Sequence, residues 1–277
     1  MSTCKYCGKD AGFMRSAHKE CLESFNAGSS EVADLLLASA RGKLAIDVAV
    51  QEIRSIAIRS FIDSESLRKA VVKGFESAVD LALNDDLLTQ DEEDALATYQ
   101  SRFDSSNELQ RSSPSYTRLV KAGFLREMME GKLPERVVID GYLPINFQKS
   151  ERPVWVFQDV EYLQPRTRTT YEGRSSGVSF RVMKGVYYRV GQFKGNPVQT
   201  TQIVAIDTGL LAVTDKHLYF VGQSKSVKIK FDKIISLHPY SDAVAIHRDG
   251  VAKQDIFKTD DGWFTYNLLS NLVFKRD

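Results

Sequence analysis

The first half of the chain has apolar residues at intervals of three and four. Between residues 31 and 62, and again between residues 64 and 86, these intervals follow the 3.6-residue period of amphipathic helices. Gly42 lies within the first segment and is expected to divide it into two helices. Residues 117–135 continue the helical pattern, which is expected to stop at Gly131. The pattern therefore predicts a mainly helical first half.

A capping box marks one more helix start. Thr89 stands three residues before Glu92, an arrangement in which each side chain accepts the free backbone N–H of the other residue. We expect a helix from about Gln90 to Phe103. The residues that follow, 105–115, combine Ser, Asn and Pro and are typical of a linker.

From Val137 onward the pattern changes to short runs of β-branched and aromatic residues, separated by Gly, Asp and Pro. These runs cover residues 137–145, 153–164, 178–193, 201–222, 226–239 and 243–250. Helical spacing returns in the last segment, 259–274, where Trp263, Leu269 and Val273 recur on one side. The second half therefore predicts an antiparallel β domain with a C-terminal helix packed on the sheet.

Composition and charge narrow the class of protein. With 43% apolar and 26% charged residues the chain should fold, and a net charge of +1 gives no overall attraction to nucleic acid or anionic lipid. Any such binding needs a local basic patch. No apolar run approaches the roughly 20 residues that span a membrane, and the first ten residues lack the apolar segment of a signal peptide. A cytoplasmic protein is expected.

All three cysteines lie within the first 21 residues. Together with His18 they form two pairs, Cys4-x2-Cys7 and His18-x2-Cys21, that have the same spacing. An odd number of thiols argues against disulfides, whereas Zn²⁺ takes four thiolate and imidazole ligands in a tetrahedron. Gly8 suits the tight turn of a C-x2-C pair. Four protein ligands would leave no open position for catalysis, so we expect one structural zinc ion bound by Cys4, Cys7, His18 and Cys21. The alternative is three incidental thiols beside a surface histidine.

The same residues, with Lys9 and Gly12, resemble small treble-clef zinc knuckles of the form CxxCGKxxG…HxxC. The likeness covers under a tenth of the chain. Such knuckles serve nucleic-acid binding, protein docking and plain folding alike, so the resemblance implies a fold and a zinc ion rather than one function.

Carboxylates crowd the bend between two helical segments, from Asp85 to Asp94. The bend lacks the alternation and the glycine of a calcium loop, and carboxylates at a helix start are stabilised by its dipole, so a solvated bend is the simpler interpretation. The segment 81–96 also resembles the acidic bend of TerB-like tellurite-resistance domains. In that family the bend is linked to metal, and the corresponding residues here are Asp85, Asp86 and Glu92.

Residues 209–250 predict short paired strands around a turn at Thr214-Asp215-Lys216. Alternate residues beside this turn are expected to face the core, namely Leu211, Val213, Leu218 and Phe220. Over residues 178–274 the chain resembles bacterial PH-like and GRAM-like domains, through Thr214, Asp215, Lys216, Leu218, Phe220, Ile229, Phe231, Ile234 and Ile235. The resemblance implies a fold and leaves the ligand open.

Basic residues gather on the other side of these strands. Six lie within 18 residues: Lys216, His217, Lys225, Lys228, Lys230 and Lys233. Such a face could hold phosphorylated headgroups, nucleic-acid phosphates or an acidic peptide, and the alternative is a solvated edge protected by lysines. A second basic and aromatic strip contains Arg166, Arg168, Tyr171, Arg174, Phe180 and Arg181.

The predicted fold class is α+β with three parts: a zinc knuckle (1–25), a helical domain (26–134) and a β domain (135–277) with a PH-like or GRAM-like core. The phosphate-binding pattern GxxxxGK[ST] does not occur, and His217 and His247 are expected at the surface. The working hypothesis is a non-catalytic adaptor that binds a protein partner, or an anionic lipid or phosphate group, through the β domain.

Two alternatives stay open. The first is a nucleic-acid-binding protein that contacts phosphates through the knuckle residues Lys5, Lys9, Arg15 and Lys19. The second is a metal-dependent enzyme built on the acidic bend between the helices.

Overall fold

The computed structural model describes residues 2–85, 87–106, 109, 113–134, 143–172, 175–183, 186–193 and 196–274, and for residues 168–200 it describes the strands only. The chain forms two compact units, Met1–Leu133 and Pro134–Asp277. The fold is α+β, as predicted, with a small Cys/His cluster at the N-terminus, helices in the first unit and an antiparallel sheet with a C-terminal helix in the second.

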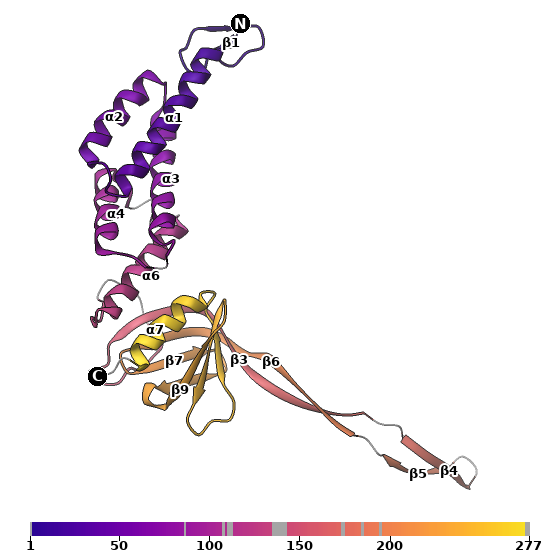
Figure 1. Ribbon diagram of the computed structural model, residues 1–277. Helices are drawn as coiled ribbons and strands as arrows, with labels where there is room; N and C mark the ends of the chain where they lie inside the picture. The colour runs from indigo at the N-terminus through magenta and orange to yellow at the C-terminus, as the bar shows by residue number, and fades with distance from the viewer. Residues whose placement is uncertain are drawn as a thin grey trace. The chain divides into compact units, whose positions relative to one another are not determined.

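The first unit starts with two short paired strands, β1 (Ser2–Thr3) and β2 (Asp10–Gly12), followed by helices (Figure 1). The described helices are α1 (Lys19–Ala40), α2 (Ile46–Arg59), α3 (Ser64–Ala82), α4 (Gln90–Arg102) and α6 (Pro114–Met129). Their core contains the fully buried side chains of Leu36, Ile53, Ile56, Phe75, Leu96 and Tyr99. The hydroxyl of Tyr99 is satisfied there because it donates to the Val71 carbonyl at 2.9 Å.

Helix α1 crosses the boundary that was expected near residue 25. It runs without a break through Gly28-Ser29-Ser30. A Cβ at position 28 would lie 2.2 Å from the Ser60 hydroxyl oxygen, so the glycine allows α1 to approach the end of α2 closely. The predicted break at Gly42 is confirmed: its φ is +68°, and its N–H donates to the Ser39 carbonyl where α1 ends.

The predicted capping box is confirmed at the start of α4. The Glu92 N–H donates to the Thr89 hydroxyl oxygen at 3.3 Å, and the Thr89 N–H donates to the Glu92 carboxylate at 3.0 Å. Further along the same helix, Glu93 pairs with Arg126 of α6, with both side chains largely buried. The acidic start of α4 is therefore used to cap one helix and to fasten it to another.

The second unit is built on a seven-stranded antiparallel sheet in the order β8-β7-β6-β3-β11-β10-β9. Its strands are β3 (Pro153–Glu172), β6 (Asn196–Thr214), β7 (His217–Gly222), β8 (Ser226–Lys230), β9 (Ile234–Pro239), β10 (Ala243–Arg248) and β11 (Asp255–Lys258). Strand β3 is central to this sheet, although it precedes the segment 178–274 for which a PH-like core was expected. The expected run 137–145 falls mostly outside the described residues.

Strands β3 and β6 pair along their whole lengths, from Pro153–Thr214 to Glu172–Asn196, and extend beyond the strands that flank them (Figure 1). Between them, β4 (Ser175–Met183) and β5 (Val186–Phe193) form a separate two-stranded hairpin. Of the second basic and aromatic strip, Arg166, Arg168, Tyr171, Phe180 and Arg181 lie on these strands, and Arg174 lies outside the described residues. Arg166 is the one member whose side chain is described, and it is exposed.

The predicted C-terminal helix is present as α7 (Gly262–Phe274), and of the residues expected to face the sheet Leu269 is fully buried, whereas Trp263 is not. Phe264 and Leu268 are fully buried, whereas Trp263 is 48% exposed. Phe264 packs edge-on against Trp155 of β3, with ring centroids 4.6 Å apart. In the part of the chain that is described, no helix combines the length and the apolar character needed to cross a membrane.

Candidate metal centre

The first two ligands of the candidate metal centre lie on a tight turn. Cys4 follows β1, and its N–H donates to the Lys9 carbonyl at 2.7 Å. The Gly8 N–H donates back to the Cys4 carbonyl at 2.9 Å, and Gly8 has a φ of +71°, a conformation that favours glycine. The turn therefore brings the sulfurs of Cys4 and Cys7 to the same side.

The start of helix α1 supplies the other two ligands. His18 is the N-cap residue with extended backbone, and Cys21 is the third residue of the helix. The His18 Nδ1 atom lies 3.4 Å from the Cys7 sulfur and 3.7 Å from the Cys21 sulfur. All four ligand atoms lie within 4.8 Å of one another. Tetrahedral zinc, with ligand distances of about 2.0–2.3 Å, needs ligand atoms about 3.3–3.8 Å apart, so a small contraction would complete the site.

The hydrogen bonds around His18 decide which nitrogen faces the sulfurs. Its Nε2 lies 2.9 Å from the backbone carbonyl oxygen of Asp10, and a carbonyl only accepts, so Nε2 carries the proton. In the neutral ring Nδ1 is then the nitrogen with a free lone pair. A metal-bound histidine is held in the same way, with one ring nitrogen on the metal and the other donating to a fixed acceptor.

Burial and hydrogen bonding shift the pKa values of Cys4 and Cys21 in opposite directions. Burial works against the Cys4 thiolate, but hydrogen bonds from the backbone N–H groups of Cys7, His18 and Tyr6 outweigh it and lower the pKa of Cys4 to about 6. Burial, together with the nearby sulfurs of Cys7 and Cys4, raises the pKa of Cys21 to about 11. Thiolates side by side disfavour one another's ionisation, and a cation between them favours the charged form of each.

No family model, no curated protein and no solved structure matches this chain. The arrangement of the Cys/His cluster therefore rests on the spacing and geometry of its own residues. The resemblances of the middle and C-terminal parts to TerB-like, PH-like and GRAM-like domains stay predictions.

The acidic bend is not assembled as a second metal centre in the described residues. The Glu92 carboxylate accepts from both the N–H and the hydroxyl of Thr89, and the Asp85 carboxylate accepts from the Leu87 N–H at 3.2 Å. Asp86 lies outside the described residues. Among the residues that are described, the Cys/His cluster is the one group of three or more ligands at metal-binding distance.

The structure places the six predicted basic residues around strands β7 and β8, but in different settings. Lys230 lies 2.5 Å from Asp232, and Lys233 lies 3.7 Å from Asp249. Lys228 lies over the Tyr219 ring, 5.0 Å from its centroid, and Lys216 reaches the Ser150 carbonyl at 3.3 Å. The Lys225 side chain is exposed beside the turn that joins the two strands.

His217 differs from the expectation, because it is 4% exposed rather than a surface residue. Its Nδ1 lies 2.8 Å from the carboxylate of Glu151, which no sequence pattern had indicated. The same carboxylate accepts from the hydroxyls of Thr214 and Tyr219, and Phe147 packs edge-on against Tyr219 with centroids 5.4 Å apart. The residues before β3 therefore cover part of the face that was expected to be open and basic.

Hydrogen bonding controls the ionisation of Glu151. Burial opposes its negative charge, yet the donors from Thr214, the Gln148 N–H, Tyr219 and His217 together lower its pKa to about 2. A fully buried carboxylate with so many donors joins the segment before β3 to the β6–β7 turn. This group has a structural role in the fold of the second unit, and His217 belongs to it.

Proposed function

We propose that the chain is a non-catalytic adaptor whose N-terminal knuckle is held together by one structural zinc ion. The single observation that supports the zinc ion best is the orientation of His18, whose protonated Nε2 is bound to Asp10 and whose free Nδ1 lies among the cysteine sulfurs. Three thiolates and one imidazole are the ligands that zinc prefers, and they fill all four positions. The role of such an ion is to hold the fold, since a segment of this size has little core of its own.

Metal analysis of the purified full-length chain tests the zinc ion. We expect one zinc per chain, and we expect Cys7→Ser to lose most of it because a hydroxyl is a far poorer ligand than a thiolate. Glu23→Gln, on the exposed side of the same helix, is the matched control and should keep the metal. A wild-type protein with far less than one zinc per chain, or a zinc content that Cys7→Ser leaves unchanged, would contradict the proposal.

The adaptor part of the proposal is supported by the edge of the sheet. Strand β8 is the first strand in the sheet order, so its outer backbone groups have no neighbouring strand in the described sheet and are available to an extended segment of a partner. Lys225 and Lys228 have no carboxylate within 4.0 Å among the described residues. A partner with acidic side chains beside an extended backbone would match both features.

Affinity capture from the native cell with the tagged full-length chain tests this surface. We expect a partner that wild type recovers and that Lys228→Glu with Lys230→Glu loses, because reversing two charges along the edge repels an acidic segment. Lys253→Glu, an exposed lysine between β10 and β11, is the matched control and should recover the partner normally. Equal recovery by the double variant would exclude β8 as the binding edge.

A further inference from the structure

A loop in the knuckle presents two large apolar side chains to solvent. Phe13 is 91% exposed and Met14 is 87% exposed, more than any other large apolar side chain in the described part of the chain. Single exposed apolar residues are common on proteins and need no explanation. Two adjacent ones at the tip of one loop form a feature of their own, which we call the Phe-Met tip.

The loop that carries the Phe-Met tip has a fixed backbone. The Ser2 hydroxyl lies 2.6 Å from the carbonyl oxygens of both Gly12 and Arg15, and the Lys5 N–H donates to the Ser16 carbonyl at 3.0 Å. Met14 itself has a φ of +58°, a conformation that a large side chain rarely adopts. The hydrogen bonds therefore close the loop at its base and hold both apolar side chains outward, where neither is buried against the rest of the knuckle.

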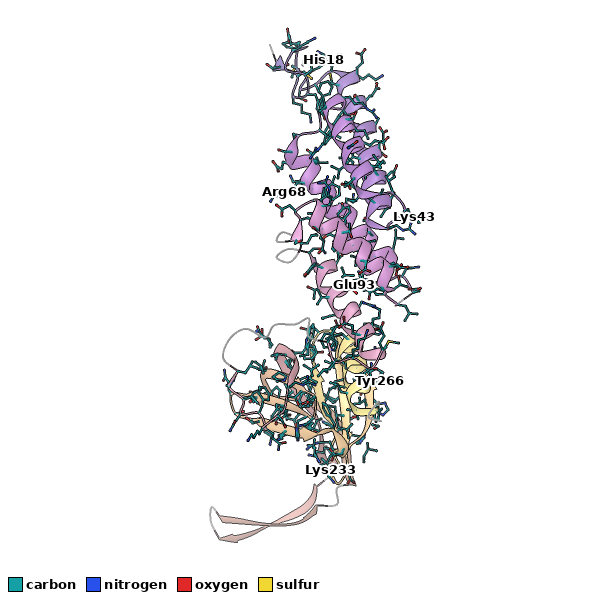
Figure 2. The ribbon with its side chains drawn as sticks, turned by 90° about the vertical axis from the view of Figure 1, so that its left-hand side faces the viewer. His18, Lys43, Arg68, Glu93, Lys233 and Tyr266 are labelled. Atoms are coloured by element: carbon teal, nitrogen blue, oxygen red, sulfur yellow. The ribbon has the colours of Figure 1, made fainter. Side chains whose placement is uncertain are left out.

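The charges around the tip are nearly all positive. Residues 2–19 contain four cations and one carboxylate, and that carboxylate, on Asp10, accepts the Gly12 N–H at 3.0 Å. The side chains of Lys5, Lys9 and Arg15 are exposed. In Figure 2 the label of His18 marks this end of the first unit. The tip is thus an apolar point in a segment with an excess of exposed cations, of which Lys19 pairs with Glu23 of α1 at 3.7 Å.

We propose that the Phe-Met tip inserts into an anionic lipid surface, with Lys5, Lys9 and Arg15 against the headgroups. Apolar side chains of peripheral proteins enter the boundary between headgroups and acyl chains, and each nearby lysine or arginine adds electrostatic attraction to anionic lipids. A lipid surface needs no matching shape, so two side chains suffice. A stable protein interface needs about 800 Å² on each side, and an apolar wedge in duplex DNA needs further contacts along a groove.

This inference rests on the proposed zinc ion for the shape of the knuckle, so zinc is to be measured on the same samples. The full-length protein is sedimented with vesicles of phosphatidylcholine alone and with vesicles that also contain phosphatidylserine. We expect wild type to bind the anionic vesicles, and Phe13→Ser with Met14→Ser to weaken that binding about 10-fold or more. Ile58→Ser removes another apolar side chain, 82% exposed in the same unit, and should bind as wild type does.

The outcomes separate the two proposals. A zinc-loaded wild type that does not bind anionic vesicles overturns the membrane inference and leaves the zinc site standing, and so does a double variant that binds as well as wild type. Binding to duplex DNA that requires Phe13 and Met14, without vesicle binding, would also overturn it in favour of nucleic acid. Equal zinc content and thermal midpoint in all variants verify that only the surface has changed.

Discussion

At the scale of single residues, Glu151 shows how a polar side chain can hold a β fold together. Its carboxylate is fully buried and accepts hydrogen bonds from three side chains, among them His217 and Tyr219. Replacing such an acceptor leaves several buried donors without a partner, and each of them then keeps its desolvation cost. The cluster of Glu151 and its donors therefore stabilises the second unit because each of these buried polar groups has a hydrogen-bond partner.

Glu151→Gln tests this role. We expect the substitution to destabilise the second unit by about 2–3 kcal/mol near neutral pH, because an amide offers fewer acceptor sites and no charge. The pKa of Glu151 in the folded chain, about 2, lies below its ordinary value, so its ionisation stabilises the fold above pH about 4.5. That contribution is lost as the pH falls toward 2.

Urea unfolding of both proteins at several pH values measures this effect. The difference in unfolding free energy between wild type and Glu151→Gln should narrow as the pH is lowered from 5 to 3. Glu161→Gln, a partly exposed carboxylate beside Lys258, is the matched control and should change stability little. A difference that stays constant across this range would mean that the charge of Glu151 does not contribute.

The candidate zinc ligands could be predicted from the sequence because they are local, with all four within 18 residues and two of them one helical turn apart. The partner of His217 could not, because Glu151 lies 66 residues earlier and comes close only after the strands have paired. The lysines of β8 were correctly placed on the face opposite Ile229, since alternation along a strand is also a local property. Local patterns thus predicted local geometry, whereas the burial of His217 and its pairing with Glu151 depend on tertiary contacts.

At the scale of elements, the start of α4 was predicted to the residue, whereas the start of α1 was not recognised as the beginning of a long helix. The capping box of α4 is a side-chain and backbone pattern within four residues, which sequence alone can specify. Gly28 within α1 instead allows a close approach to Ser60 at the end of α2, a tertiary contact that no local pattern specifies. The same reason explains α7, whose buried side is chosen by the packing of Phe264 against Trp155.

Thr89→Ala tests the contribution of the capping box to α4. We expect a loss of about 1 kcal/mol in the unfolding free energy of the first unit, since the Glu92 N–H loses its acceptor. Thr98→Ala lies later in the same helix, where the hydroxyl donates to the Asp94 carbonyl, and it should cost much less. The helical circular dichroism signal during urea unfolding provides the measurement. An equal loss of unfolding free energy in the two variants would show that the capping box contributes no more than a hydroxyl inside the helix.

At the scale of the whole molecule, the chain offers separate optical signals for its two units. Both tryptophans of the sequence, Trp155 and Trp263, lie in the second unit, whereas the described α-helices other than α7 lie in the first. Each unit also has its own buried core, with Phe75 and Tyr99 in the first and Phe220 and Phe257 in the second. A perturbation confined to the knuckle should therefore be visible in one signal and not in the other.

Zinc removal by a strong chelator under reducing conditions provides that perturbation. Without the ion, the four ligands at residues 4–21 lose the group that holds them together, so we expect protease cleavage within residues 2–25 and partial loss of helix at the start of α1. The urea midpoint monitored by tryptophan fluorescence should stay unchanged, because the second unit contains none of the four ligands and forms a compact unit of its own. A chelator that shifts the tryptophan transition would instead show that the stability of the sheet is coupled to the N-terminal metal centre.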